Sequence, residues 1–155
     1  MPDRTRGYAH RVDVRADIYE VWQSLIDPAQ LVRWCSPQVR IDPREGGIYW
    51  FRPDPELTRE AHIDVFLAPR RLRLIYMPLP ELPDEGAVIV DDFLLDIGEV
   101  AARDGGGMTV LRLLGSGVPD DRAWDAMHGR LRVGWERALL RLRSLFEPPP
   151  AKRSG

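Results

Sequence analysis

The sequence is poor in the residues that build disulfides and metal sites. Cys35 is the single cysteine, so no internal disulfide can form, which is typical of proteins of the reducing cytoplasm. The three histidines, His10, His62 and His128, lie far apart and show no metal-ligand spacing. We therefore expect a cytoplasmic protein that binds no metal and uses no cofactor.

The chain also has no large excess of charge of one sign and no long apolar run. The 22 basic and 24 acidic side chains give a formal net charge of −2, which provides no overall positive field for nucleic acid or an anionic membrane. No apolar run approaches the ~18 residues that span a bilayer, and residues 1–7 contain no signal-peptide core. The 155 residues are the usual length of one domain. We expect residues 1–147 to form it and the proline-rich residues 148–155 to be a disordered tail.

A long amphipathic helix is predicted between Asp121 and Phe146, because apolar residues recur there at spacings of three and four. Its apolar face consists of Trp124, Met127, Leu131, Trp135, Ala138, Leu139, Leu142 and Leu145, and arginines and acids occupy the other side. Gly129 and Gly134 interrupt it, at about 1 kcal/mol each relative to alanine. At Gly134 the missing side chain either lets a strand approach closely or leaves room for a ligand.

The rest of the chain predicts one strand, two short helices and about six further strands. Asp17 and Asp27-Pro28 begin the two helices. The expected strands are Tyr8–Val14, Val39–Asp42, Ile48–Arg52, Thr58–Leu67, Arg71–Tyr76, Ala87–Ala101 and Met108–Leu114. A loop is expected at Met77–Gly86, a hairpin turn at 105–107, and an end to the last strand at 115–117. Successive strands joined by hairpins imply an α+β fold, in which an antiparallel sheet of about seven strands curls around the long helix.

Several segments together resemble a known family. They are Val12-Asp13-Val14, Val21-Trp22-Gln23-Ser24-Leu25, Leu31-Val32-Arg33-Trp34, Gly46-Gly47-Ile48-Tyr49-Trp50-Phe51, Ala68-Pro69-Arg70-Arg71-Leu72, Gly106-Gly107-Met108-Thr109-Val110-Leu111 and Gly134-Trp135. In order and spacing they resemble the Bet v 1-like or START-like (SRPBCC) superfamily, in its Activator of Hsp90 ATPase homologue branch. The resemblance implies a helix-grip fold, in which a curved sheet wraps the carboxy-terminal helix and encloses a cavity. Members bind lipids, hormones and polyketides, and a few are cyclases or dehydratases.

Strand alternation predicts the side chains that face this cavity. The candidate ligand-binding residues are His10, Trp34, Tyr49, Phe51, Tyr76, Asp91, Phe93, Leu95, Leu111, Trp124, His128, Leu131, Gly134 and Trp135. The polar candidates have structural alternatives. The tyrosines could be ordinary core residues, His128 could bond to a backbone carbonyl, and Asp91 could mark a bulge. An inward carboxylate is costly unless it is paired, so Asp91 with Tyr76 and His128 are the candidates for acid–base catalysis.

Three functions remain open at this point. The first is binding of a small, largely apolar or aromatic ligand in the cavity. The second is a cyclase-like or dehydratase-like enzyme, and the third is an interaction domain that stimulates a chaperone ATPase. A cavity of roughly 300 Å³ or more would support the first two, and a filled core with an exposed apolar patch would favour the third. The sequence leaves open whether the protein is catalytic, which ligand it takes and whether it forms a homodimer.

Overall fold

A computed structural model describes residues 4–78, 87–99 and 107–147, which form seven strands and three α-helices. Their bounds are β1 (Thr5–Val14), α1 (Ile18–Ile26), α2 (Pro28–Trp34), β2 (Gln38–Ile41), β3 (Ile48–Asp54), β4 (Leu57–Leu67), β5 (Arg71–Tyr76), β6 (Val90–Ile97), β7 (Thr109–Pro119) and α3 (Asp125–Leu145), with a 3₁₀ turn η1 (Arg122–Trp124) before α3. Residues 79–86 of the loop expected at Met77–Gly86, residues 105 and 106 of the expected turn, and the tail at 148–155 lie outside the described residues.

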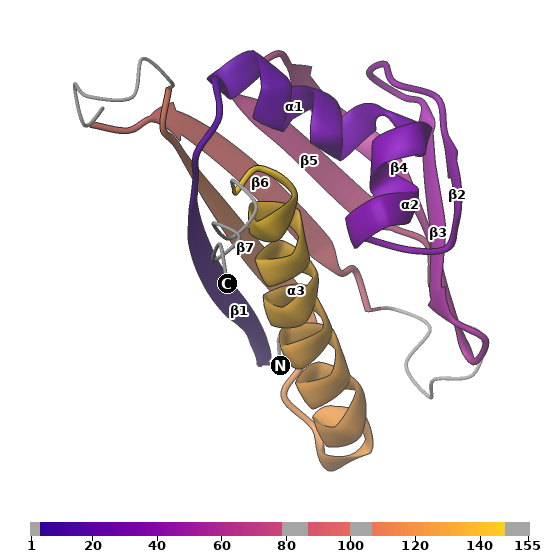
Figure 1. The fold of residues 1–155 in the computed structure, drawn as a ribbon. Helices are drawn as coiled ribbons and strands as arrows, with labels where there is room; N and C mark the ends of the chain where they lie inside the picture. Colours follow the sequence, from indigo (N-terminus) through magenta and orange to yellow (C-terminus); the bar gives the residue numbers. More distant parts are fainter. Residues whose placement is uncertain (1–3, 79–86, 100–106, 148–155) are drawn as a thin grey trace, which may run out of the picture.

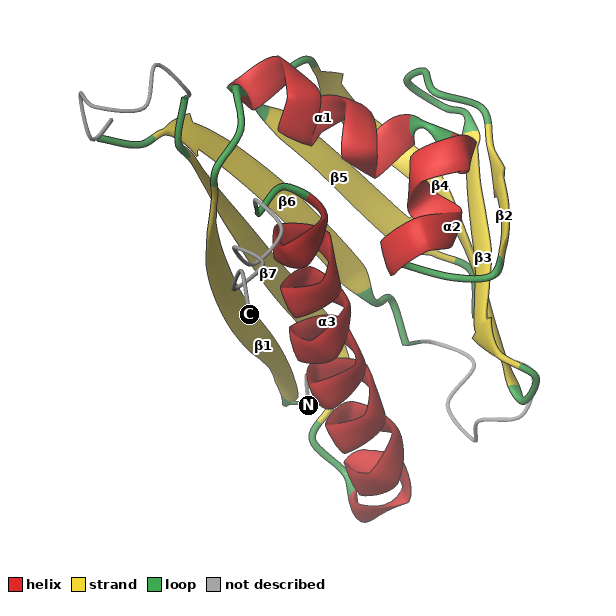
Figure 2. Ribbon diagram, in the orientation of Figure 1, coloured by secondary structure: helices red, strands yellow, loops and turns green. Residues whose placement is uncertain are grey.

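The strands form one antiparallel sheet in the order β1-β7-β6-β5-β4-β3-β2. The sheet curves, and all three α-helices lie over the same face of it (Figures 1 and 2). The helix α3 runs over β1, β7 and β6, while α1 and α2 cover the other end of that face. The predicted α+β helix-grip fold is therefore confirmed.

Local sequence signals begin the first two helices as expected. The Asp17 carboxylate accepts the backbone N–H of Tyr19, and the Asp27 carboxylate accepts that of Ala29. Each bond satisfies an amide that has no partner inside its helix. These caps fix where α1 and α2 begin, and the apolar sides of both helices then face the sheet.

The last helix also follows its apolar pattern. Six of the eight residues predicted on its inner face are buried, while Met127 and Leu145 are half-buried against the core. None of the helices in the described residues is both long and apolar enough to cross a membrane.

The prediction that residues 115–117 end the last strand was wrong, because β7 continues through them to Pro119. At Gly115 the ring of Tyr8 occupies the space of a side chain, and an added Cβ would lie 2.2 Å from that ring. Gly117 has φ of +85°, a conformation that favours glycine. These glycines let the strand bend and stay paired with β1. By contrast, β6 is shorter than the strand expected from Ala87 onward.

Candidate functional site

A buried polar cluster lies where β1, β4, β6 and α3 meet. Asp91 of β6 is 0% exposed and accepts hydrogen bonds from three other elements. Its Oδ1 accepts the hydroxyl of Tyr8, and its Oδ2 accepts Nε1 of Trp135 at 3.0 Å and Nη1 of Arg59 at 3.5 Å. A carboxylate this deep is stable only when it is paired and hydrogen-bonded, and both conditions are met here.

Arg59 supplies the positive charge of the cluster. It comes from β4, is 3% exposed, and its guanidinium lies 3.8 Å from the ring centroid of Tyr76 and 5.7 Å from that of Phe51. Burial alone would lower the pKa of Arg59, but its interactions with Tyr76 and Asp91 raise it overall, so the guanidinium stays charged. The ion pair with Asp91 therefore leaves the centre of the cluster electrically neutral.

The buried tyrosines are held in their neutral form. Burial is the main cause that raises the pKa values of Tyr8, Tyr49 and Tyr76 well above 10. The Asp91 carboxylate raises the pKa of Tyr8 further. Tyr49 donates its hydroxyl to the carbonyl of Leu25 at 2.6 Å, so it holds α1 against β3 as a core residue.

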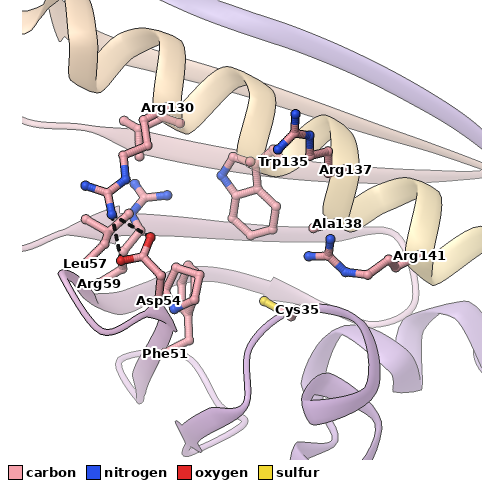
Figure 3. A pocket seen from close by; sticks show the side chains of 13 residues that line it. Cys35, Phe51, Asp54, Leu57, Arg59, Arg130, Trp135, Arg137, Ala138 and Arg141 are labelled. Carbon is pink, nitrogen blue, oxygen red and sulfur yellow. Dashed lines mark hydrogen bonds and ion pairs between the residues drawn. The ribbon is translucent and has the colours of Figure 1, made fainter.

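A pocket of about 180 Å³ opens beside this cluster, between α3, the β3–β4 hairpin and the end of α2 (Figure 3). Its lining residues are Cys35, Phe51, Pro53, Asp54, Leu57, Arg59, Arg130, Leu131, Gly134, Trp135, Arg137, Ala138 and Arg141. A depression of about 270 Å³ lies beyond Asp54, but its lining contains no aromatic residue. The pocket that combines aromatic, apolar and charged side chains is therefore the candidate site.

The pocket is smaller than the roughly 300 Å³ that would support ligand binding or catalysis in a cavity. Large side chains fill most of the space between the sheet and the helices. Trp34, Trp124, Tyr49 and Phe93 are among the largest fully buried residues. Among the described residues the interior is therefore a packed core, and the candidate pocket opens at the edge of α3.

Gly134 creates part of that opening. A Cβ added there would meet no atom within 4 Å, so no strand packs closely against this glycine. Of the two alternatives for Gly134, close packing of a strand is therefore wrong, and there is open space beside the pocket. The aromatic wall next to it consists of Trp135 and Phe51, whose ring centroids are 5.7 Å apart.

Arginines surround the mouth of the pocket. Arg130 forms an ion pair with Asp54 at 2.5 Å, and Nε of Arg141 donates to the carbonyl of Trp34 at 2.9 Å. Figure 3 shows Arg130 on one side of Trp135, and Arg137 and Arg141 on the other. Contacts within the protein therefore fix the side chains of Arg130 and Arg141, so their guanidinium groups stay near the opening.

Cys35 lies on the pocket wall opposite α3 (Figure 3). Burial raises the pKa of its thiol to about 12. A thiol of that pKa is protonated at neutral pH and is a poor nucleophile. Cys35 therefore contributes apolar surface to the pocket.

The structure brings together only part of the predicted site. Four of the predicted residues line the pocket: Phe51, Leu131, Gly134 and Trp135. Six are plain core residues: Trp34, Tyr49, Phe93, Leu95, Leu111 and Trp124. Asp91 and Tyr76 surround Arg59 behind the pocket wall.

The histidines do not approach the Asp91 carboxylate closely enough to share a proton with it. Nε2 of His128 is 2.9 Å from the carbonyl of Gly7, which is the backbone contact offered as its structural alternative. His10 is half-buried with its ring centroid 5.9 Å from that of Tyr8, and His62 is exposed. The described residues therefore hold no carboxylate–histidine pair at this cluster.

Sequence reasoning missed the charged part of the pocket. Arg59 shares the inward parity of Ala61 and Ile63 on β4, and that alternation could have revealed it. The arginines of α3 were assigned to the outer face of the helix because they are charged. Nothing in a helical periodicity shows that a strand hairpin approaches that face.

Metal binding has no support in the described ranges, where no group of three His, Cys, Asp or Glu side chains lies close enough to hold an ion.

The curved sheet gripping α3, with a pocket at the edge of that helix, defines a helix-grip domain of the SRPBCC type. Residues 15–147 match the family described as Activator of Hsp90 ATPase homolog 1-like protein. The chain belongs to that family. No curated protein is significantly similar to it in sequence.

Solved structures share the fold at low sequence identity. MLL2253 from Mesorhizobium loti is 17% identical with a TM-score of 0.74, over 90% of this chain and 96% of that one. The Aha1 dimer from Colwellia psychrerythraea is 17% identical with a TM-score of 0.71, over 94% and 99%. CalU16 from Micromonospora echinospora is 24% identical with a TM-score of 0.67, over 93% and 78%.

Proposed function

We propose that this protein binds a small, largely apolar or aromatic molecule in the pocket beside Trp135. The observation that carries the proposal is the open space at Gly134, which lies next to an aromatic wall on an otherwise filled core. Ligand sites typically combine apolar and aromatic walls with a few fixed polar groups. Phe51, Leu131 and Trp135 provide the walls, and the arginines provide the polar groups.

The volume limits the size of the ligand. An apolar cavity of about 150 Å³ accommodates benzene, so a pocket of about 180 Å³ suits one ring with a small substituent. A larger molecule would have to extend through the mouth into solvent. We therefore expect single-ring compounds to be the smallest sufficient ligands.

Binding without catalysis is favoured over the cyclase-like or dehydratase-like alternative. A general base must lie within hydrogen-bond reach of the proton that it removes. Asp91 already accepts three hydrogen bonds, from Tyr8, Trp135 and Arg59, and it lies behind the pocket wall. The chaperone-stimulating alternative derives from the family description.

Native mass spectrometry followed by a thermal-shift screen of single-ring compounds tests the proposal. At a ligand concentration one hundred times the Kd, stabilisation of about 2.7 kcal/mol would raise the Tm by roughly 5–10 °C for a chain of this length. The variant Gly134→Leu should lose the response, because its side chain would fill the opening. Gly129→Leu is the matched control, since Gly129 also has open space around it but does not line the pocket. The absence of any bound or stabilising compound would contradict the proposal.

A further inference from the structure

We infer that the ligand of this pocket is an anion, and we propose a single-ring aromatic carboxylate as its chemical class. The inference rests on the proposed binding function and adds the charge of the ligand to it. It is carried by the arrangement and the pairing of the arginines around the pocket.

The arginines of α3 form a stripe with a glycine inside it. Arg130, Gly134, Arg137 and Arg141 are four, three and four residues apart, which places them along one side of a helix. All four line the pocket. Because Gly134 has no side chain and no atom lies within 4 Å of an added Cβ, the stripe contains an opening between arginines.

The positive charges of the pocket exceed the negative ones. Among the described residues of the lining, Asp54 is the one acid, and it is paired with Arg130. Arg59 is balanced by Asp91 behind the wall. Arg141 donates to a neutral carbonyl and keeps its full charge, and Arg137 makes no hydrogen bond or ion pair with any described residue. Among the residues that the structure describes, two charges around the pocket therefore remain unbalanced, in a chain whose net charge is −2.

Arg59 adds a buried hydrogen-bond donor to the pocket, although its charge is balanced by Asp91. Among the described residues, its guanidinium makes one hydrogen bond, from Nη1 to Asp91. A guanidinium has five N–H donors, and the Arg59 side chain lines the pocket while only 3% exposed. A buried donor group with spare capacity favours an acceptor in the ligand.

The chemistry of the lining selects a carboxylate on a ring. Planar guanidinium groups match the two oxygens of a carboxylate, and these charge-assisted bonds are stronger than neutral ones. Trp135 and Phe51 offer ring faces and edges to an aromatic body. The volume of about 180 Å³ excludes fused ring systems from the interior. Benzoate and phenylacetate have the matching size and charge.

Titration calorimetry with benzoate, benzyl alcohol and benzylamine tests the charge requirement on wild-type protein. Benzoate should bind about tenfold or more tightly than benzyl alcohol, since a hydrogen bond to a charged group adds that much affinity. Its affinity should fall as salt is raised, because the arginines are near solvent. Benzylamine should bind most weakly.

Two substitutions should act in opposite directions on benzoate. Arg137→Ala removes an unbalanced cation and should weaken benzoate binding about tenfold, and benzyl alcohol binding by less, because the alcohol carries no charge. Asp54→Asn removes the acid that occupies Arg130 and should strengthen benzoate binding. Arg132→Ala is the control, because Arg132 is an exposed arginine of the same helix that does not line the pocket.

The outcomes show whether the anion inference fails alone or together with the proposed binding function. Equal binding of benzoate and benzyl alcohol, both blocked by Gly134→Leu, would overturn the anion inference and leave the binding function standing. Failure of all three compounds would count against both. Inorganic phosphate binding as tightly as benzoate would contradict the claim that the ligand is aromatic. An unchanged benzoate affinity in Arg137→Ala would contradict the claim that the arginines of α3 bind the anion.

Discussion

Nε1 of Trp135 donates a hydrogen bond to Oδ2 of Asp91 over 3.0 Å, and this bond ties the middle of α3 to the start of β6. Tyr8 from β1 and Arg59 from β4 bind the same carboxylate. One buried residue therefore connects four elements that are far apart in the sequence. Trp135 also forms the pocket wall, so the cluster holds the binding surface in place.

Asp91→Asn should strongly destabilise the fold. The amide nearly preserves the shape of the side chain but leaves the buried Arg59 without its counter-charge, and breaking a buried ion pair costs about 3–5 kcal/mol. Urea denaturation measures the free energy of unfolding. The control is Asp92→Asn, whose partner Arg71 lies 2.8 Å away near the surface, where a pair contributes about 1 kcal/mol or less. Equal losses in the two variants would show that the cluster does not anchor the fold.

The protein should lose stability at alkaline pH. Tyr8, Tyr49 and Tyr76 have pKa values above 10 in the folded state, mainly because of burial. Below pH 10 both states keep these protons, and the contribution to stability is complete. Above pH 10 the unfolded chain releases protons that the folded chain retains, so the free energy of unfolding falls. Each group adds a slope of about 1.4 kcal/mol per pH unit.

Cys35 should move the onset of this loss to lower pH. Its pKa rises from 9.0 to about 12 on burial, so its contribution begins to decline near pH 9. Urea denaturation between pH 8 and pH 11 follows the curve. In Cys35→Ala the decline should begin near pH 10 instead, and an unchanged onset would contradict the assignment to the thiol.

The same burial should protect Cys35 from alkylation. At pH 8 the folded protein should react with iodoacetamide more than tenfold more slowly than the urea-unfolded chain, because the thiolate is the reacting form. Mass spectrometry counts the modified molecules over time. The unfolded chain is the matched control, and equal rates in the two states would show that the thiol is accessible and ionised.

Alanine at the helical glycines should stabilise the protein. Neither Gly129 nor Gly134 has an atom within 4 Å of an added Cβ, so each alanine should raise the free energy of unfolding by roughly 0.5–1 kcal/mol. Gly115→Ala should do the opposite by about 1–3 kcal/mol, since its Cβ would collide with the ring of Tyr8. Thermal unfolding of the three variants measures these changes in stability. A stabilised Gly115→Ala would contradict the close contact between β1 and β7.

Apolar periodicity predicted most of the fold. The spacing from Trp124 to Leu145 and the alternation in the strands are local signals, and a buried face must repeat with the period of its element. Asp17 and Asp27 marked where helices begin for an equally local reason. Gly115 and Gly117 were misread because a glycine that ends a strand and one that accommodates a ring across the sheet look alike in sequence.

The sequence predicted less of the candidate site than of the fold. Strand parity placed Asp91 in the interior and helical spacing placed Trp135 on the inner face, so the sequence by itself determined which groups are buried. Only the tertiary structure decided that Arg59 neutralises Asp91, that tryptophans fill the expected cavity, and that the β3–β4 hairpin meets the arginine side of α3. These are contacts between segments far apart in the chain, and periodicity within one segment carries no information about what lies across from it.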